Sequence, residues 1–389
     1  MSEEYEGVDL PEQISVRMEK REQLNKLGDA YPVSLPITHT IEATKAHYPA
    51  LEADIATGDV VGLAGRIMFL RNTGKLCFAT LQSGTGERIQ AMISLDRVGQ
   101  EQLDLWKELV DLGDHVFVEG EVITSKRGEL SVLASKWLMA AKTLRPMPNL
   151  HNDLGEEFRV RHRYIDLIVR DRAREVVKIR AQVMQSLRNT FANRAFMEIE
   201  TPMLQVMHGG ASARPFKTHS NAFDTELYLR IAPELFLKRA VVGGLERVFE
   251  INRNFRNEGA DRTHSPEFAM LEAYEAYGDY HTMMDLTQEL IQNAASDVLG
   301  TQVVTMEDGS ENDLSGNWPR ISMYESLSEA AGHQITPETP LADLKKLAGS
   351  LDIEIDHPLH GKYVEELWEH FVKPGLTAPT FVIDFPVDT

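Results

Sequence analysis

Apolar and polar residues alternate in a way that divides the first part of the chain into short elements. Apolar side chains at near-helical spacing from Ile14 to Leu27 predict an amphipathic leader helix that ends at Gly28. Alternation with a period of two then predicts strands at 60–70, 76–81 and 88–93, a helix around 103–110, and strands at 116–123 and 130–134. Three strands, a helix and two strands is the order of an OB-fold barrel, which commonly binds single-stranded nucleic acid.

The pattern changes after this barrel. Two prolines in RPMPNL from Arg145 predict an extended linker, so we place a first domain at 1–148 and a second at 149–389. A long helix follows, with Asp171 as its expected cap and an apolar face that repeats as Val176, Ile179, Val183, Leu187 and Phe191. Strands and helices then alternate irregularly. The predicted class is therefore α+β.

Two neighbouring segments of the second domain carry the most informative polar pattern. In VFEINRNFRNEG from Val248, an extended chain places five polar residues on one face: Glu250, Asn252, Asn254, Arg256 and Glu258. In FAMLEAYEAY, Phe268, Met270, Glu272 and Tyr274 likewise share a face. If the two strands form an antiparallel hairpin, these groups converge on one surface. The alternative is an ordinary strand with its polar face in water.

Such a surface suits a nucleotide together with a cationic amino acid. When ATP activates a carboxylic acid, the ionised carboxylate attacks the α-phosphate, and an arginine such as Arg256 can stabilise the charge that develops. A purine can stack on Phe268, which is worth about 1–3 kcal/mol per base. A buried ammonium needs a carboxylate partner, which Glu272 and the Tyr274 hydroxyl can supply.

Two further segments are weaker candidates. RIAPELFLKR from Arg230 predicts a strand that leads into a helix, with Glu234 in its first turn. A first-turn carboxylate is also favoured by the helix dipole alone, so both interpretations stay open. In HGGASARPF, Gly209 and Gly210 would let a ligand approach the backbone, although paired glycines are commonly just a turn.

Composition limits the class of protein. The net charge of −20 excludes nucleic-acid binding over the whole surface, so any RNA contact must be local. Arginines cluster between 159 and 174, for which a solvated helix face is the simpler interpretation. The single cysteine, Cys77, predicts a buried apolar residue and no disulfide within the chain. Neither a secretion signal nor a long apolar run is found, so we expect a cytoplasmic protein.

Several of these segments together resemble the class II aminoacyl-tRNA synthetases. FRNEG at Phe255 with HSPEF at His264 resembles motif 2 of that class, and NRAFMEIETPML from Asn193 resembles motif 1, which builds the dimer interface there. The usual glycine of motif 1 is Ala195 here. GGASARPF, RIAPELFLKR and MLEAYEAYGDY are similar to the lysine-specific, bacterial-type members. The resemblance implies a catalytic domain built on a mostly antiparallel sheet flanked by helices.

The same resemblance implies a function and its residues. It implies activation of L-lysine with ATP and Mg²⁺ and transfer of the lysyl group to the 3′ end of tRNA(Lys) by a homodimer. Arg256 is the implied catalytic residue and contacts the α-phosphate and the lysine carboxylate. The other implied ATP contacts are Glu258, His264 and Phe268, and the other implied lysine contacts are Gly210, Glu234, Glu272 and Tyr274. In the barrel, the implied anticodon contacts are Arg71, Phe78, Gln90 and Glu129, although Phe78 judged by its strand alone would be a core residue.

The end of the chain and the competing families complete the expectation. Motif 3 and the acidic metal-binding positions of the class are not found before Thr389, so we expect no magnesium ligand within this chain. We interpret the chain as C-terminally incomplete, with a catalytically impaired tRNA-binding or dimerising fragment as the alternative function. The lysyltransferase that modifies elongation factor P shares the motifs but lacks the barrel. Aspartyl- and asparaginyl-tRNA synthetases share the architecture, but their substrates fit Glu272 poorly.

Overall fold

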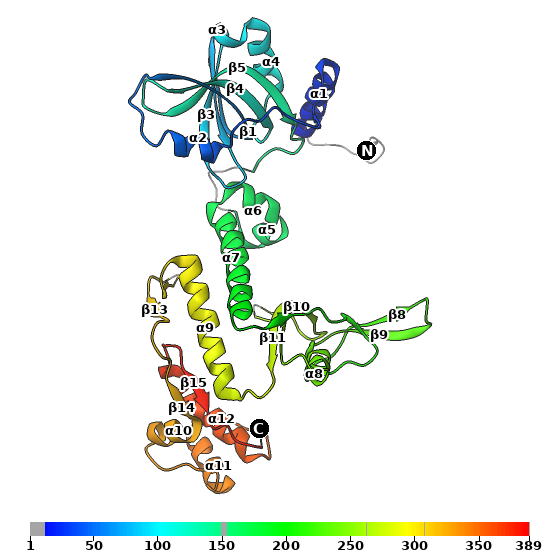
Figure 1. Cartoon of the computed structure of the whole chain (residues 1–389), viewed down its shortest axis with the longest axis vertical. Coiled ribbons are helices and arrows are strands. Elements are labelled where there is room, and N and C mark those ends of the chain that lie inside the picture. Colours follow the sequence, from blue (N-terminus) through cyan, green and yellow to red (C-terminus); the bar gives the residue numbers. More distant parts are fainter. Residues whose placement is uncertain (1–11, 149–153, 262, 307, 389) are drawn as a thin grey trace. The chain divides into compact units, whose positions relative to one another are not determined.

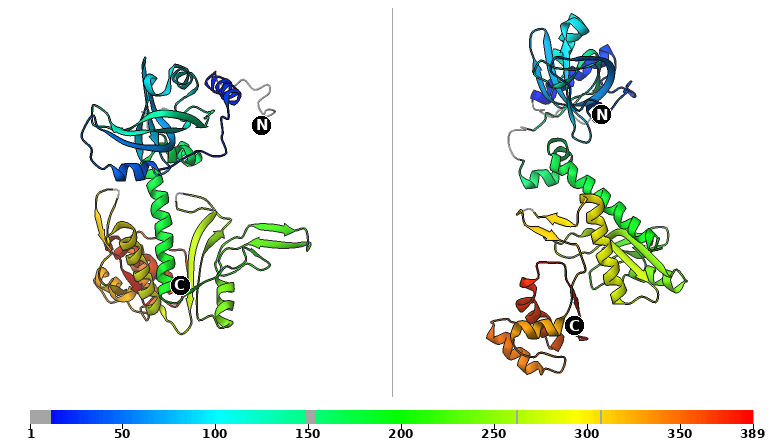
Figure 2. Two further views of the ribbon diagram at one scale, coloured as in Figure 1. Left: turned by 45° about the horizontal axis from the view of Figure 1, so that its top comes forward. Right: turned by 60° about the vertical axis from the view of Figure 1, so that its left-hand side comes forward.

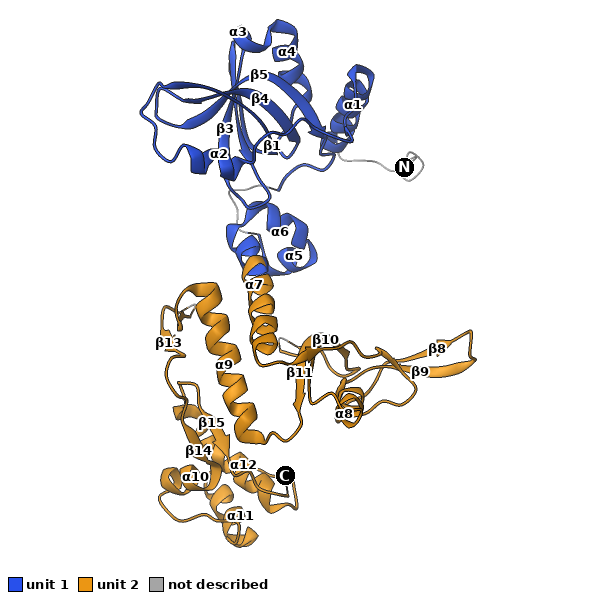
Figure 3. Ribbon diagram, viewed as in Figure 1, with its two compact units in different colours: residues 1–177 blue, residues 178–389 orange. Residues whose placement is uncertain are grey.

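The computed structural model describes residues 12–148, 154–261, 263–306 and 308–388. The chain forms two compact units, residues 1–177 and 178–389 (Figure 3). The division falls within helix α7 (Asp171–Asn193). The end of the sequence-predicted linker, residues 149 and 150, lies outside the described residues, and the domain boundary at 148 stays a prediction.

The first unit contains a closed five-stranded barrel, with strand order β1-β2-β3-β5-β4 (Figure 1). Its elements are β1 (Ala56–Asn72), β2 (Leu76–Gln82), β3 (Arg88–Ser94), α3 (Leu95–Val98), α4 (Gln100–Leu109), β4 (His115–Thr124) and β5 (Leu130–Ala141). The predicted order and the OB-fold are confirmed. β1 and β5 are longer than predicted. The register of β1 with β4 shifts between Ala56 and Val60, and that of β5 with β4 shifts just after Ala134, so the simple alternation is interrupted where the predicted strands begin and end.

The barrel core follows the period of two. On β2, Cys77, Ala79 and Leu81 are buried, whereas Phe78 between them is only half-buried and belongs to the outer face. The interpretation of Phe78 as a core residue is therefore wrong, and that of Cys77 as a buried residue is confirmed. Within α4, Leu103, Trp106 and Leu109 cover one end of the core.

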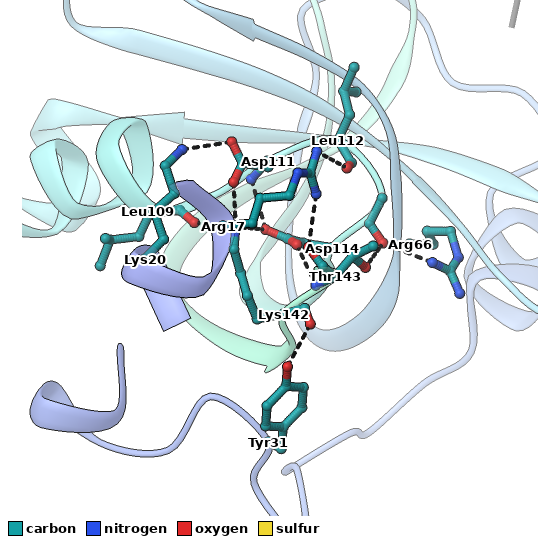
Figure 4. Close-up of polar contacts among 11 residues, drawn as sticks. Arg17, Lys20, Tyr31, Arg66, Leu109, Asp111, Leu112, Asp114, Lys142 and Thr143 are labelled. Atoms are coloured by element: carbon teal, nitrogen blue, oxygen red, sulfur yellow. Dashed lines mark hydrogen bonds and ion pairs between the residues drawn. The ribbon is translucent and has the colours of Figure 1, made fainter. Parts of the chain in front are cut away.

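Polar contacts attach the leader helix α1 (Glu12–Leu27) to the barrel (Figure 4). Gly28 closes the helix as predicted, with its N–H 3.0 Å from the Leu24 oxygen. Leu24 is the buried residue of α1. The other contacts come from Arg17, which donates to the Thr143 and Leu112 carbonyls, and from Lys20, which pairs with Asp111 at 2.7 Å. Partly buried polar contacts and one buried leucine thus hold the helix against the barrel.

The described residues of this unit also form three further helices, besides the start of α7. These are α2 (Ile41–His47), α5 (Glu156–Arg161) and α6 (Arg163–Val169). The arginines of the 159–174 cluster largely pair with carboxylates of their own helices; Arg163 and Arg170, for example, both contact the buried Asp166. Asp171, the predicted cap, is the first residue of α7 and pairs with Arg174 one turn later. These pairs favour the solvated helix face over a dedicated anion site.

The second unit is built on a three-stranded sheet of order β11-β10-β6. Helices α7 and α9 lie on one side of it, and a hairpin of β8 and β9 projects beyond it (Figures 1 and 2). The elements are β6 (Met197–Glu198), β7 (Leu204–Gln205), β8 (Lys217–Ser220), β9 (Thr225–Leu229), α8 (Glu234–Val242), β10 (Arg247–Phe255), β11 (Glu267–Glu275) and α9 (Tyr280–Leu299). The mixed α+β class is confirmed.

The C-terminal part of this unit has a hydrophobic core of its own. It contains β12 (Val303–Thr305), β13 (Glu311–Asp313), β14 (Arg320–Ser322), α10 (Met323–Ala331), α11 (Leu341–Ser350), α12 (His360–Phe371) and β15 (Phe381–Ile383). Leu327, Val364 and Leu367 are fully buried at its centre. In the described ranges of the chain, no helix is long and apolar enough to span a membrane.

Candidate functional site

The hairpin of β10 and β11 is antiparallel over its full length, from Arg247 opposite Glu275 to Phe255 opposite Glu267. Cross-strand partners lie on the same side of a sheet, and alternate residues of one strand share a side. Glu250 is opposite Glu272, and Asn254 is opposite Phe268. The even-numbered residues of both strands therefore form one face, as the sequence predicts.

The odd-numbered face of the hairpin packs against the hydrophobic core of the second unit. Phe249, Ile251 and Leu271 pack there against Phe191 of α7 and against α9, and the rings of Phe191 and Phe249 stack with their centroids 4.2 Å apart. Both helices are on this side, as the two views of Figure 2 also show. Helix α8 packs against the same two strands and brings its polar residues to the even-numbered face.

Arg256 lies on the even-numbered face although β10 has ended at Phe255. Its backbone N–H donates to the Pro266 carbonyl at 2.9 Å, which continues the hairpin by one residue. Its guanidinium carbon lies 5.1 Å from the centroid of the Phe268 ring. Phe268 and Glu272 are both even-numbered residues of β11 and share a face, so Arg256 and Glu272 are on the same side of the sheet.

Two of the predicted ATP contacts lie in the loop between the strands. The prediction that five polar residues share one strand face is wrong for Glu258, because the strand stops three residues earlier. A carboxylate oxygen of Glu258 instead accepts from the Arg214 backbone N–H at 3.4 Å. His264 is exposed, and its Nδ1 lies 2.8 Å from an oxygen of Asp261. Hydrogen bonds from the Thr263 backbone and from His264 lower the pKa of Asp261.

Glu272 and Tyr274 form a hydrogen-bonded acid and phenol. The Tyr274 hydroxyl donates to Glu272 Oε1 at 2.7 Å. The pKa of Glu272 is raised, mainly by burial and further by the charges of Glu234 and Glu250. The hydrogen bond from Tyr274 and the charge of Lys238 oppose this increase. Burial and the neighbouring Glu272 also raise the pKa of Tyr274, so its hydroxyl stays protonated. The pair is a half-buried acidic group on the even-numbered face that is suited to a cation.

Helix α8 brings a second carboxylate, Glu234, near Glu272. Glu234 is the first residue of α8 and pairs with Lys238 at 2.6 Å one turn later. Gly210 packs directly on it: its φ is +86°, and a Cβ there would lie 2.8 Å from the Cβ of Glu234. A side chain at Gly209 would similarly meet Leu235 at 2.9 Å. This close approach, and not a simple turn, requires the paired glycines.

A buried ion pair lies on the same face, at Glu250, and was not found from the sequence. Arg230 Nη1 is 2.7 Å from Glu250 Oε1, and both side chains are almost fully buried. The Thr201 hydroxyl donates to the other oxygen of Glu250 at 2.6 Å. Two sequence features pointed to these residues separately: Glu250 belongs to the polar alternation of β10, and Arg230 begins the segment RIAPELFLKR. Neither identified the partner.

Several buried polar atoms of the hairpin have no hydrogen-bond partner among the described residues. They are Nδ2 and Oδ1 of Asn252, Oδ1 of Asn254 and Nε of Arg256. Asn252 and Asn254 lie on the same strand face as Glu250, next to Phe268 and Met270 of β11. Because an unpaired buried polar atom is costly, these atoms mark a surface that is suited to a polar ligand.

The four predicted barrel residues form two adjacent pairs. The Arg71 guanidinium carbon lies 4.6 Å from the centroid of Phe78, its cross-strand neighbour. Gln90 Nε2 donates to Glu129 Oε2 at 2.7 Å. β2 and β3 pair directly, and Phe78 and Gln90 both belong to the outer face. A stacking ring and hydrogen-bonding groups are thus displayed together.

Known proteins match this chain over nearly its whole length. Residues 155–389 match the family described as tRNA synthetases class II (D, K and N), and residues 48–139 match the OB-fold nucleic acid binding domain. The chain is 61% identical over 390 aligned residues to the lysine–tRNA ligase of Kineococcus radiotolerans, covering 100% of this chain and 78% of the relative. The lysine–tRNA ligases of Mycolicibacterium gilvum and Mycobacterium tuberculosis are 58% and 56% identical, each covering 98% of this chain and 77% of the relative.

The chain belongs to the lysine–tRNA ligase family of class II synthetases.

Membership of this family decides between the competing enzyme families. The barrel, which the elongation-factor-modifying paralogues lack, is present both in the structure and in the family match. The relatives named above are lysine enzymes, not aspartate or asparagine enzymes. Class II synthetases use ATP, and the even-numbered face described above is where this chain brings an arginine and an aromatic ring together.

The described residues form no metal site by themselves. Within the described parts of the chain, no group of three or more His, Cys, Asp or Glu residues could hold a metal. Mg²⁺ is commonly held by one or two carboxylates together with substrate phosphates. We therefore assign no residue of this chain to Mg²⁺.

Proposed function

We propose that this protein activates L-lysine with ATP to lysyl-adenylate and transfers the lysyl group to the 3′ end of tRNA(Lys). One observation carries the proposal: a single face of the β10–β11 hairpin holds Arg256 over Phe268, together with the Glu272–Tyr274 pair. This face offers a positive charge, an aromatic ring and an acidic end. Those are the groups that a nucleotide and a cationic amino acid require.

Arg256 and Phe268 are assigned to ATP. In this reaction the lysine carboxylate is already ionised and is itself the nucleophile, so no general base is needed. The barrier comes from negative charge on the phosphoryl oxygens, and a fixed guanidinium lowers it. Arg256 has a free Nε as well as its terminal nitrogens to donate. Phe268 provides a surface for the adenine, and Glu258 and His264 complete the assignment from the loop.

The acidic end of the face is assigned to lysine. An ammonium taken out of water without a partner costs several kcal/mol, so it requires a carboxylate. Glu272, with the Tyr274 hydroxyl hydrogen-bonded to it, receives the ε-ammonium, while Glu234 and the backbone at Gly210 receive the α-amino group. The contact of Gly210 with Glu234 supports this grouping.

Lysine-dependent exchange of pyrophosphate into ATP tests the assignment, and each site residue has a matched control. Arg256→Ala is expected to reduce exchange at least 10²-fold, the size of effect seen when a charge-stabilising donor is lost. Arg253→Ala removes an exposed arginine from the opposite face of the same hairpin and should leave exchange within about twofold. Equal effects of the two substitutions would contradict the assignment.

Glu272→Gln tests the lysine end in the same assay. It should raise KM for lysine by about 10²-fold, because the ε-ammonium loses a buried charge partner worth about 2–5 kcal/mol. Glu275→Gln, which removes a carboxylate paired with Arg247 at the end of the same strand, is the control. A similar KM for both variants would show that Glu272 does not contact lysine.

The barrel is proposed to read the uridine-rich anticodon. Phe78 would stack on one base, and Arg71, Gln90 and Glu129 would form hydrogen bonds. The outward position of Phe78 and the pairing of Gln90 with Glu129 support this role. Phe78→Ala should weaken tRNA(Lys) binding about tenfold, since base stacking is worth about 1–3 kcal/mol, whereas Phe78→Trp should retain it. Unchanged affinity in Phe78→Ala would refute the role.

Three further parts of the proposal concern the oligomeric state, the metal ion and the location of the protein. We propose a homodimer through motif 1, which is supported by exposed apolar side chains in that segment, at Met197, Met203 and Leu204. Sedimentation at micromolar concentration tests it. Mg²⁺ enters with ATP, as the counter-ion of its phosphates. A cytoplasmic location follows from the proposed role in protein synthesis.

A further inference from the structure

Lys238 is a partly exposed cation beside the acidic end of the even-numbered face. Its ammonium pairs with Glu234 at 2.6 Å and lies 5.8 Å from the centroid of the Tyr274 ring. Tyr274 in turn donates to Glu272 at 2.7 Å. Glu234, Lys238, Tyr274 and Glu272 therefore form a continuous chain of contacts from helix α8 to strand β11.

We propose that Lys238 is a positioning residue of the lysine site, whose ammonium fixes the Glu234 carboxylate beside the Glu272–Tyr274 pair. The inference rests on the function proposed above. An exposed pair four residues apart on a helix is commonly worth only about 0.3–0.5 kcal/mol, and such a pair would need no further role. Lys238 differs from such a pair because a second element, the Tyr274 ring on β11, also holds its ammonium.

The charges around Glu272 give Lys238 a second effect. Glu272 is faced by Tyr274 on its own strand, by Glu250 from β10, and by Glu234 and Lys238 from α8. Burial and the two glutamates favour the protonated acid, while Tyr274 and Lys238 favour the carboxylate. In the proposed site, the ε-ammonium of lysine binds the ionised form of Glu272. Removing the charge of Lys238 therefore makes lysine binding more sensitive to acid.

The chain offers a closely matched control. Lys217 pairs with Glu226 at 3.1 Å and lies 5.4 Å from the centroid of the Tyr228 ring, on the projecting β8–β9 hairpin. Its side chain is 61% exposed, compared with 57% for Lys238. Lys217 thus repeats the local chemistry of Lys238, an ion pair and a ring, with a carboxylate that has no place in the proposed lysine site.

The experiment is calorimetric titration of the protein with L-lysine at pH 8.0 and pH 5.5, for the wild type, Lys238→Met, Lys238→Arg and Lys217→Met. Lys238→Met is expected to raise Kd about fivefold at pH 8.0, the upper range for a partly exposed pair. Its Kd should also rise more steeply than that of the wild type on lowering the pH. Lys238→Arg keeps the charge and should stay within about twofold of the wild type, as should Lys217→Met. Circular dichroism checks that each variant is folded.

The outcomes separate this inference from the function on which it rests. If the wild type binds lysine and Lys238→Met matches Lys217→Met at both pH values, Lys238 has no positioning role and the proposed function stands. If Lys238→Arg is as weak as Lys238→Met, the charge is not what matters and the inference is also overturned. If the wild type itself does not bind lysine, the lysine site is refuted together with the role of Lys238.

Discussion

Replacing the buried Lys142 by methionine should strongly destabilise the barrel unit (Figure 4). The Lys142 side chain is completely inaccessible, and its Nζ donates to the Leu109 carbonyl at 2.7 Å, to Asp111 at 2.5 Å and to Asp114 at 2.7 Å. Asp114 is equally inaccessible. Breaking a buried pair by removing one partner costs about 3–5 kcal/mol, because the other charge is left uncompensated.

The lower end of that range applies here. Asp114 keeps two backbone donors, the N–H groups of Asp111 and Thr143, each at 2.8 Å. We expect a loss of about 3 kcal/mol at pH 7, which corresponds to about a 10²-fold faster opening of the barrel amides. The double variant Lys142→Met with Asp114→Asn should recover part of the loss, because it leaves no buried charge at Asp114.

The pH dependence follows from the direction of the Asp114 pKa. Burial raises this pKa in the folded protein even though Lys142 opposes the increase. A carboxyl whose folded pKa is raised favours the folded state below the unfolded pKa and loses that contribution as the pH rises through the folded pKa. Removing Lys142 raises the folded pKa of Asp114 further. The deficit of the variant should therefore be largest at pH 7 and shrink towards pH 5.

Hydrogen exchange measured by mass spectrometry can follow peptides of β4 and β5 separately from those of the second unit. Lys20→Met is the control, since Lys20 contacts the same Asp111 from a partly exposed position and should cost at most about 1 kcal/mol. The reasoning is refuted if Lys142→Met opens the barrel no faster than Lys20→Met at pH 7. It is also refuted if its deficit grows as the pH is lowered.

Two other substitutions test backbone conformations at glycine-type positions. Ala195 has a φ of 58°, where an L-residue is strained by about 1–2 kcal/mol. Ala195→Gly removes this strain but adds entropy to the unfolded chain, so the free energy of unfolding of the second unit should rise by about 0.5–1 kcal/mol. Urea unfolding measures this change. Gly210→Ala should raise the Kd for lysine at least tenfold in calorimetry, because the added Cβ would displace Glu234. The control is Gly349→Ala, which should leave Kd unchanged because a Cβ there meets nothing within 4 Å. Equal Kd values in the two variants would contradict the proposed packing.

The barrel was predictable because its information is local. Alternation along β2 identifies Cys77, Ala79 and Leu81 as inward, and each neighbouring strand repeats the same period. The prediction was less accurate where the register shifts, before Val60 of β1 and after Ala134 of β5, since a bulge leaves no compositional mark. Phe78 was misjudged by its residue type, although the buried residues on either side of it already placed it outside.

Contacts between distant segments were beyond the sequence. Lys142 and Asp114 are 28 residues apart and Arg230 and Glu250 are 20 apart, and nothing in their spacing links them. The hairpin was an exception, because both of its strands alternate and they follow one another along the chain, so that the antiparallel pairing followed from two local patterns. Even there, the end of β10 at Phe255 decided that Glu258 leaves the shared face.

Helix α8 shows why residue roles need the structure. Glu234 with Lys238 and Glu157 with Arg161 are both pairs of acidic and basic residues four apart, and the sequence does not distinguish them. The difference comes from Leu237, which is fully buried, and from Pro233, which is also buried at the start of the helix. Burial of these two residues fixes the rotation of α8 against the sheet, so that its charged pair meets Tyr274. In α5, no residue is buried, and its pair remains exposed to solvent. The same spacing is therefore a surface pair in one helix and part of the proposed lysine site in the other.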